Sequence, residues 1–251
     1  MRTQFIESLD FDVIPLIGFK NRRRGYPIKF NPARIWEDLD KYRSRASALA
    51  AYMRRKWITV QFSRQSKPPA GPLMVVAGEF EPDYESRSGW VYDDIRVIIF
   101  ASRDQFDAFE WTQESWNAFK ALFLRTALHE IVHARQFANN KRDWMMYHVP
   151  HTRSKSVSVQ NQRQYLSNIC EVEAYAHCCY FELKSNYKNF DFKTLPDRLS
   201  ANVKSPSLRY YLRVFGYRGA KDKLVIKRLV ARIRAWERVY RRHFEILNRS
   251  S

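Results

Sequence analysis

Cysteine is scarce in this sequence, and its few copies are not arranged for cross-linking. Only three of the 251 residues are cysteines, and Cys170, Cys178 and Cys179 all fall within one short segment. An odd number of clustered cysteines does not predict a disulfide framework, and the spacing does not match the paired cysteines of a structural zinc knuckle. We therefore expect buried free thiols in a reducing compartment.

Long apolar runs are also missing. No stretch approaches the roughly 20 apolar residues that cross a bilayer, which predicts a protein without a membrane span. Residues 1–12 include acidic side chains where a signal peptide would need an apolar core. We therefore expect a cytoplasmic protein that is not secreted through a signal peptide.

Acidic residues are too few to balance the basic ones. The 44 Lys and Arg residues exceed the 26 Asp and Glu residues, which gives a formal net charge of +18. Such an excess favours polyanions or an acidic protein partner, although a solvated surface that keeps the protein soluble would carry the same charge. We expect non-specific polyanion binding to be concentrated on one basic helix near the C-terminus. Its cations are Lys223, Lys227, Arg228, Arg232, Arg234, Arg238, Arg241 and Arg242.

What is present is enough apolar material for a core, with 45% hydrophobic and 15% aromatic residues. Segments rich in β-branched and aromatic residues predict strands at 57–62, 73–80 and 95–101. Apolar residues at helical spacing predict one helix from Pro32 to about residue 56, and another at 113–139 that Thr112 caps. Three further helices are expected at 169–187, 206–215 and 221–247. The polar segment 140–162 is predicted to be a loop, and residues 1–30 an irregular arm or a short hairpin.

The clearest chemical signal is the run His129-Glu130-Ile131-Val132-His133 inside the helix at 113–139. Two histidines four residues apart project from one helix face on successive turns, so both imidazoles can reach one metal ion at about 2.0–2.1 Å. Glu130 lies about 100° around the helix from His129. It can therefore stay off the metal and accept a proton from a water molecule, which is the arrangement that hydrolysis needs.

A third ligand must come from elsewhere, because catalytic zinc usually has three protein ligands and one open position. His148 and His151 in the loop and His177 on the next helix are candidates. The segment 170–177 offers two more, because Glu171 and Glu173 each begin a Glu-x-x-Ala pattern.

The pairing of His-Glu-x-x-His with a later helix carrying Glu-x-x-Ala resembles the gluzincin clan of zinc metallopeptidases. The resemblance covers about residues 95–185. It implies that His129, His133 and Glu171 bind one zinc ion and that Glu130 is the general base. It also implies that the strand at 95–101 provides a sheet edge along which substrate lies. Part of this region, residues 165–177, is similar to zincin-like proteins of tailed phages, which would place the protein in a host cytoplasm or a virion.

Three features depart from the pattern or leave alternatives open. The interval between His133 and Glu171 is longer than in the thermolysin type, so a loop must intervene. Glu173 begins a second register, and residues two apart on a helix point about 200° away from each other, so only one of the two can face the metal. Asn168 and Glu171 also have the spacing of a capping box. The residue that stabilises the oxyanion is undecided among His148, His151, Tyr210 and Arg209.

The fold we expect is α+β and zincin-like, with a small mixed sheet packed on the motif helix and the glutamate helix, and a helical C-terminal region. The expected division is an N-terminal arm at 1–30, a metallohydrolase domain at 31–190 and a basic helical region at 191–251. The expected function is a metallopeptidase that cleaves a protein or peptide substrate. The alternatives are a non-catalytic structural or nucleic-acid-associated protein on the same scaffold, and an effector protease with a narrow substrate. A site kept only for structure has no need of Glu130.

Overall fold

The computed structural model divides the chain into two compact units, Met1–Arg135 and Gln136–Ser251, which are described separately here. The division at residues 30 and 190 that the sequence suggests stays a prediction. The class is α+β, with one mixed three-stranded sheet, helices and a helical C-terminal region. The structure describes residues 17–20, 27–30, 32–56, 58–63, 76–82, 93–139, 159–187, 189–199, 203–216 and 219–249.

The first described elements of the first unit are two short strands, β1 (Ile17–Lys20) and β2 (Pro27–Phe30). They pair in antiparallel register, with Ile17 opposite Phe30. Of the two expectations for this segment, the short hairpin therefore agrees with the structure.

The single helix expected from Pro32 to residue 56 is wrong, because the chain breaks it into three pieces. These are α1 (Pro32–Leu39), the 3-10 turn η2 (Asp40–Tyr42) and α2 (Ala46–Arg54). Ser44 adopts a left-handed conformation with φ of 55° between the pieces, and Asp107 accepts a hydrogen bond from the backbone N–H of Ala46 at the new helix start. Tertiary partners for these groups outweigh the continuous helical pattern of the sequence.

The sheet contains β3 (Ile58–Phe62), β4 (Val76–Pro82) and β5 (Asp93–Ile99) in the order β3-β5-β4. β5 runs parallel to β3 and antiparallel to β4. The expectation that the strand at 95–101 forms an edge is therefore wrong, since β5 is central. Its apolar residues on both faces are buried, as expected for a strand covered on two sides. The strands at the two ends of this order are β3 and β4.

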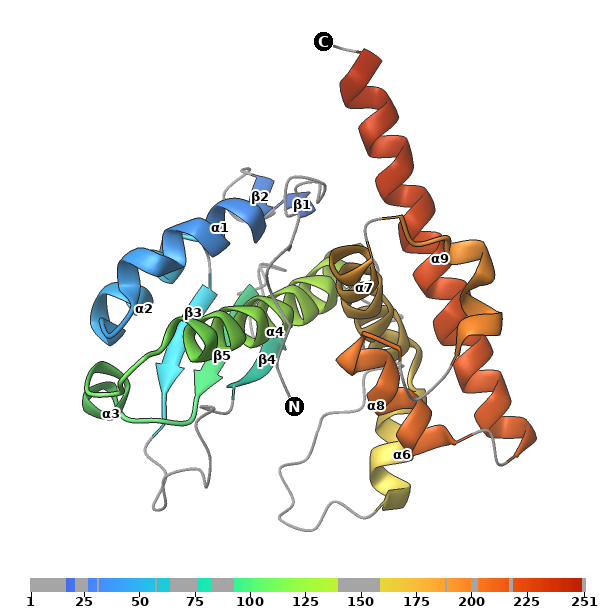
Figure 1. Ribbon diagram of the computed structural model, residues 1–251, viewed down its shortest axis with the longest axis horizontal. Coiled ribbons are helices and arrows are strands. Elements are labelled where there is room, and N and C mark those ends of the chain that lie inside the picture. Colours follow the sequence, from blue (N-terminus) through green and yellow to red (C-terminus); the bar gives the residue numbers. More distant parts are fainter. Residues whose placement is uncertain are drawn as a thin grey trace, which may run out of the picture. The chain divides into compact units, whose positions relative to one another are not determined.

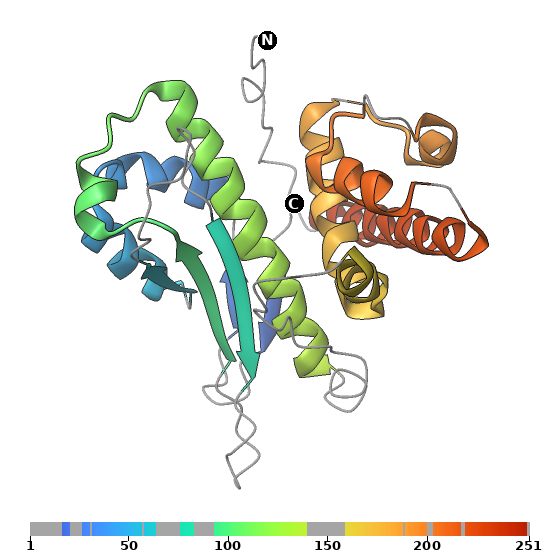
Figure 2. The ribbon, with the colours of Figure 1, turned by 90° about the horizontal axis from the view of Figure 1, so that it is seen from below.

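The motif helix α4 (Gln113–Asn139) lies along this sheet, as Figures 1 and 2 show. Thr112 caps it as expected, because the Thr112 hydroxyl accepts a hydrogen bond from the backbone N–H of Ser115 at 3.1 Å. The sequence reading missed the preceding short helix α3 (Arg103–Asp107), which begins with a capping box formed by Ser102 and Gln105. Both helices contribute to one buried aromatic cluster, which consists of Phe106, Trp111, Trp116 and Phe119.

The second unit is helical (Figure 1). Its described elements are α6 (Val159–Ser167), α7 (Ile169–Asn186), η3 (Phe192–Arg198), α8 (Pro206–Phe215) and α9 (Ala220–Arg249). α9 packs against α7, α8 and η3, while α7 also contacts α6 and α8. Gly216 ends α8 in the left-handed conformation with φ of 46°, as its position after the apolar run predicts. α6 was not expected, since its first residues fall in the predicted loop.

The buried carboxylate of Glu182 on α7 forms hydrogen bonds with the start of α8. Glu182 is 8% exposed and accepts hydrogen bonds from the Ser205 hydroxyl, the Ser207 hydroxyl and the Ser207 backbone N–H at 2.6–2.9 Å. A negative charge at a helix N-terminus is favourable because the first backbone N–H groups point toward it.

Among the helices of the described residues, none is long and apolar enough to cross a membrane.

Candidate metal centre

The two motif histidines lie one turn apart on α4 and face each other. Their Nε2 atoms are 3.1 Å apart, and the rings meet edge to face with centroids 4.7 Å apart. His133 is 3% exposed, whereas His129 is partly exposed. The helical period alone produces this pairing, because side chains at positions i and i+4 share a helix face.

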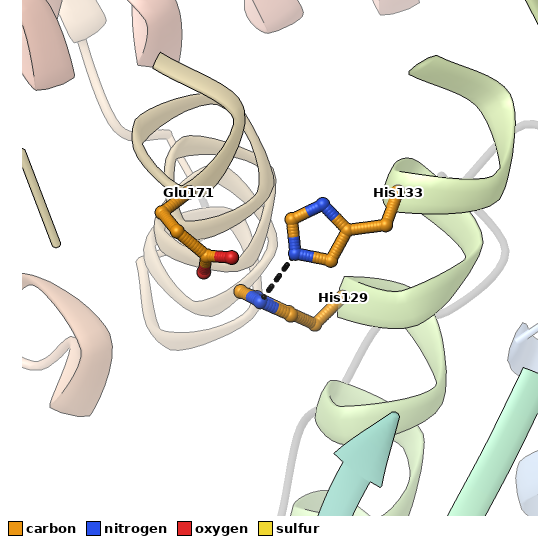
Figure 3. Close-up of side chains that lie close together, drawn as sticks. All are labelled: His129, His133 and Glu171. Carbon is orange, nitrogen blue, oxygen red and sulfur yellow. Dashed lines mark hydrogen bonds between the residues drawn. The ribbon is translucent and has the colours of Figure 1, made fainter. Parts of the chain in front are cut away.

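Glu171 comes from the first turn of α7. Its helix begins at Asn168, whose side chain accepts a hydrogen bond from the backbone N–H of Cys170 at 2.8 Å. Within the second unit, the Gln136 side chain at the end of α4 donates a hydrogen bond to the Cys170 carbonyl at 3.1 Å. Glu171 itself is 2% exposed. One ligand atom from each of His129, His133 and Glu171 lies within 4.8 Å of the other two (Figure 3).

The geometry of this group fits one bound metal ion. Two nitrogen ligands at 2.0–2.1 Å on a tetrahedral ion stand about 3.3 Å apart. The observed separation of 3.1 Å between the two Nε2 atoms is close to that value. The carboxylate of Glu171 lies on the open side of the two rings (Figure 3) and supplies an oxygen donor. Among the described residues, this buried group is thus one that could hold a metal ion.

Glu130 is buried next to the edge strand. The side chain is 6% exposed, and a Cβ atom added at Gly78 of β4 would stand 2.6 Å from Glu130 Cγ and 2.8 Å from its Cδ. The absence of a side chain at Gly78 therefore leaves the space that the Glu130 carboxylate occupies. Sequence reading missed Gly78, and a glycine inside a strand pattern was the available signal.

The second register places Glu173 in a different environment. Its carboxylate pairs with Arg232 of α9 at 3.1 Å and is not part of the His129–His133–Glu171 group. This agrees with the helical period, which turns Glu173 about 200° away from Glu171. The Asn168 side chain caps α7 by accepting a hydrogen bond from the backbone N–H of Cys170. Asn168 can therefore cap the helix while the Glu171 carboxylate belongs to the His129–His133–Glu171 group.

The remaining candidate histidines do not join the group in the described residues. His177 is fully buried between Trp236 and Tyr240 and shares a hydrogen bond with the Tyr240 hydroxyl. It therefore contributes to the core between α7 and α9. His148 and His151 lie outside the described residues.

Two of the candidates for stabilising an oxyanion are on α8. Arg209 is exposed, whereas Tyr210 is partly buried and accepts a hydrogen bond from the Gln162 side chain at 2.6 Å. The Tyr210 ring lies 6.0 Å from that of Tyr175, which stands one turn after Glu171 on α7.

Tyr211 lies behind this pair of rings in the interior. Its hydroxyl donates a hydrogen bond to the Leu166 carbonyl at 2.9 Å, and its ring packs edge to face on Tyr175. Burial raises the pKa of Tyr211 well above its ordinary value, and the nearby Tyr175 and Glu171 raise it further. Tyr211 therefore stays protonated and supports the first turns of α7.

Comparisons with protein-family models, curated proteins and solved structures find no match for this chain. The likeness to gluzincins thus rests on the motif residues themselves. What the structure adds is a buried His-His-Glu group on two helices, which could hold one metal ion.

Proposed function

We propose that the protein is a zinc-dependent hydrolase that cleaves peptide bonds. The observation that carries the proposal is the convergence of one ligand atom each from His129, His133 and Glu171 within 4.8 Å. Two imidazoles and one carboxylate form a common protein ligand set of catalytic zinc, which leaves a fourth position for water or substrate. The absence of thiolate ligands from the group argues against a closed structural zinc site.

The residues of the chain divide the work of hydrolysis. His129, His133 and Glu171 hold the ion, which would polarise the substrate carbonyl and acidify a water molecule. Glu130 accepts the proton of the attacking water and then delivers it to the leaving amine, so it acts first as a base and then as an acid. Burial of Glu130 beside Gly78 restricts its carboxylate to one position, which favours efficient proton transfer.

The edge strand supports a peptide as the substrate. β4 is at one end of the strand order β3-β5-β4, and Gly78 within it lies against Glu130. An extended peptide can add to a sheet edge through backbone hydrogen bonds. A peptide held along β4 would therefore present its carbonyl groups near the proton acceptor.

The experiment is to measure zinc content and peptide hydrolysis on the same purified samples. Wild type should bind one zinc ion per chain and cleave members of a mixed peptide library, detected by mass spectrometry. His133→Ala should lose the metal, because only two ligands remain. Glu130→Gln should keep the metal and lose about 10²- to 10⁴-fold in rate. Glu110→Gln, an exposed glutamate in the first unit, is the matched control and should behave like wild type.

Two results would contradict the proposal. Equal zinc content in wild type and His133→Ala would show that the histidines do not bind the metal. Loss of zinc in Glu130→Gln would reassign Glu130 as a ligand and remove the proposed proton acceptor.

A further inference from the structure

The C-terminal helix α9 has one apolar face that is already used for packing. Val225, Ile226, Leu229, Ile233 and Trp236 are all 7% exposed or less. They lie on the side of α9 that packs against α7, α8 and η3. The opposite side of the helix faces solvent and carries most of its cations.

Four of these cations form a line along one flank of α9. Lys223, Lys227 and Arg238 are exposed, and Arg234 is partly exposed. At about 100° per residue the four fall within an arc of roughly 60°, and at about 1.5 Å per residue they extend over roughly 22 Å of the helix axis. We call these four residues the basic stripe.

The cations of the stripe differ from Arg232 and Arg241 on the same helix, which have carboxylate partners. Arg163 pairs with Asp222, Arg232 with Glu173, and Arg241 with Glu237. In the part of the chain that the structure describes, no carboxylate forms an ion pair with a member of the basic stripe. Asp222 and Glu237 of α9 therefore pair with other cations, and neither compensates the charge of the stripe.

We infer that the basic stripe is a docking surface for the phosphate backbone of duplex nucleic acid. A line of cations about 22 Å long spans six to seven base pairs, at roughly 3.4 Å per base pair along one strand. Lys and Arg in such a line neutralise phosphates without reading bases. The stripe includes no aromatic side chain for stacking, so binding is expected to be independent of sequence.

The packing of α9 favours a nucleic acid over a membrane surface as the partner of the basic stripe. A helix that lies in the bilayer interface needs its apolar face free for insertion. Between residues 225 and 240 the apolar face of α9 is buried against its own unit, and of the large apolar side chains that the structure describes on this helix, only Leu224 and Val239 are exposed. Phosphate contact through the stripe needs no such face.

The test compares two variants of the full chain that lose the same charge. The stripe variant carries Lys223→Gln, Lys227→Gln, Arg234→Gln and Arg238→Gln. The control variant replaces four exposed cations of the same unit outside the stripe with glutamine, and these are Lys193, Lys204, Arg209 and Lys221. Binding to a 20-base-pair duplex is measured by fluorescence anisotropy at several salt concentrations, with circular dichroism to check the fold.

Wild type should bind the duplex, and its affinity should fall steeply with salt. The stripe variant should bind at least tenfold more weakly at low salt, and the slope of log K against log salt should become shallower by up to about 3.6, since each of four lost phosphate contacts removes about 0.9. The control variant should stay within threefold of wild type.

Other outcomes would overturn the inference. Equal losses in the two variants would show that net charge alone drives binding. No duplex binding by wild type at low salt, with stripe-dependent binding to anionic vesicles or to polyglutamate instead, would assign the stripe to a membrane or an acidic protein. The inference does not depend on the metal centre, so either can fail alone.

Discussion

Gly78 of β4 lies so close to the Glu130 side chain of α4 that a Cβ atom at residue 78 would stand 2.6 Å from Glu130 Cγ. Real Cβ contacts do not approach so closely, so one of the two groups must move if residue 78 gains a side chain. Gly78 does not have a positive φ, so alanine can adopt its backbone conformation. The contact with Glu130 is therefore the main obstacle to a larger residue here.

Gly78→Ala should displace the Glu130 carboxylate without touching the metal ligands. We expect zinc content to stay at the wild-type level and peptide hydrolysis to fall by about 10²-fold, the cost of a displacement of about 1 Å at a reacting group. Gly219→Ala is the matched control, because a Cβ there meets nothing within 4 Å. Wild-type activity in Gly78→Ala would show that the Glu130 position is not critical.

The two glutamates of α7 should separate in metal affinity. Glu171→Gln removes the carboxylate that completes the proposed ligand set with His129 and His133, so zinc affinity should fall by at least 10²-fold. Glu173→Gln removes a partly exposed ion pair with Arg232, worth about 0–1 kcal/mol, and should keep the metal. Competition with a zinc chelator measures both variants. If Glu173→Gln loses the metal and Glu171→Gln keeps it, the register is shifted by two residues.

The serines at the start of α8 should matter for stability and not for metal binding. Ser207→Ala removes a hydrogen bond from its hydroxyl to the buried Glu182 carboxylate, and we expect a loss of about 1.5–3 kcal/mol. Denaturant unfolding followed by circular dichroism measures it. Thr194→Ala provides the control, because that hydroxyl bonds the Asp191 carbonyl in an exposed turn. A loss below 0.5 kcal/mol in Ser207→Ala would mean that Glu182 finds another donor.

Asp38 should make the first unit more sensitive to acid. Hydrogen bonds from Lys41 at 2.7 Å and from Tyr52 at 2.8 Å hold the pKa of Asp38 below its ordinary value, with Lys41 the larger cause, while partial burial opposes the shift. A carboxyl whose pKa is lower in the folded state binds fewer protons than in the unfolded chain. Its stabilising contribution is therefore full above the unfolded pKa and is lost as pH falls through the folded pKa.

Asp38→Asn should remove this dependence. The difference between the melting temperatures at pH 7 and pH 3 should be smaller in the variant than in wild type. Glu37→Gln on the same helix has an exposed side chain and is the control. An unchanged difference in Asp38→Asn would show that other carboxyl groups dominate acid unfolding.

Local periodicity was enough to place the motif in the right structural context. The cap at Thr112, the helix through His133 and the facing of His129 and His133 all follow from spacing within one helix. Helical geometry depends on contacts three and four residues apart, so a sequence displays it directly. The end of α8 at Gly216 is local for the same reason.

Tertiary structure decided the features that depend on residues far apart in the chain. The break near Ser44 coincides with hydrogen bonds to Asp40 and Asp107 that the pattern at 32–56 does not reveal. The central place of β5 depends on which strands pair, and its buried apolar run is compatible with an edge or a centre until β4 is placed.

The choice between Glu171 and Glu173 was open in the sequence for a similar reason. Both glutamates begin the same pattern, and the helical period shows only that they point in different directions. The sequence by itself determined that two histidines and one glutamate of the motif share a helix. Only the packed structure set Glu171 near the histidines, Glu173 against Arg232 and Gly78 beside Glu130, because each of these contacts joins separate elements of the chain.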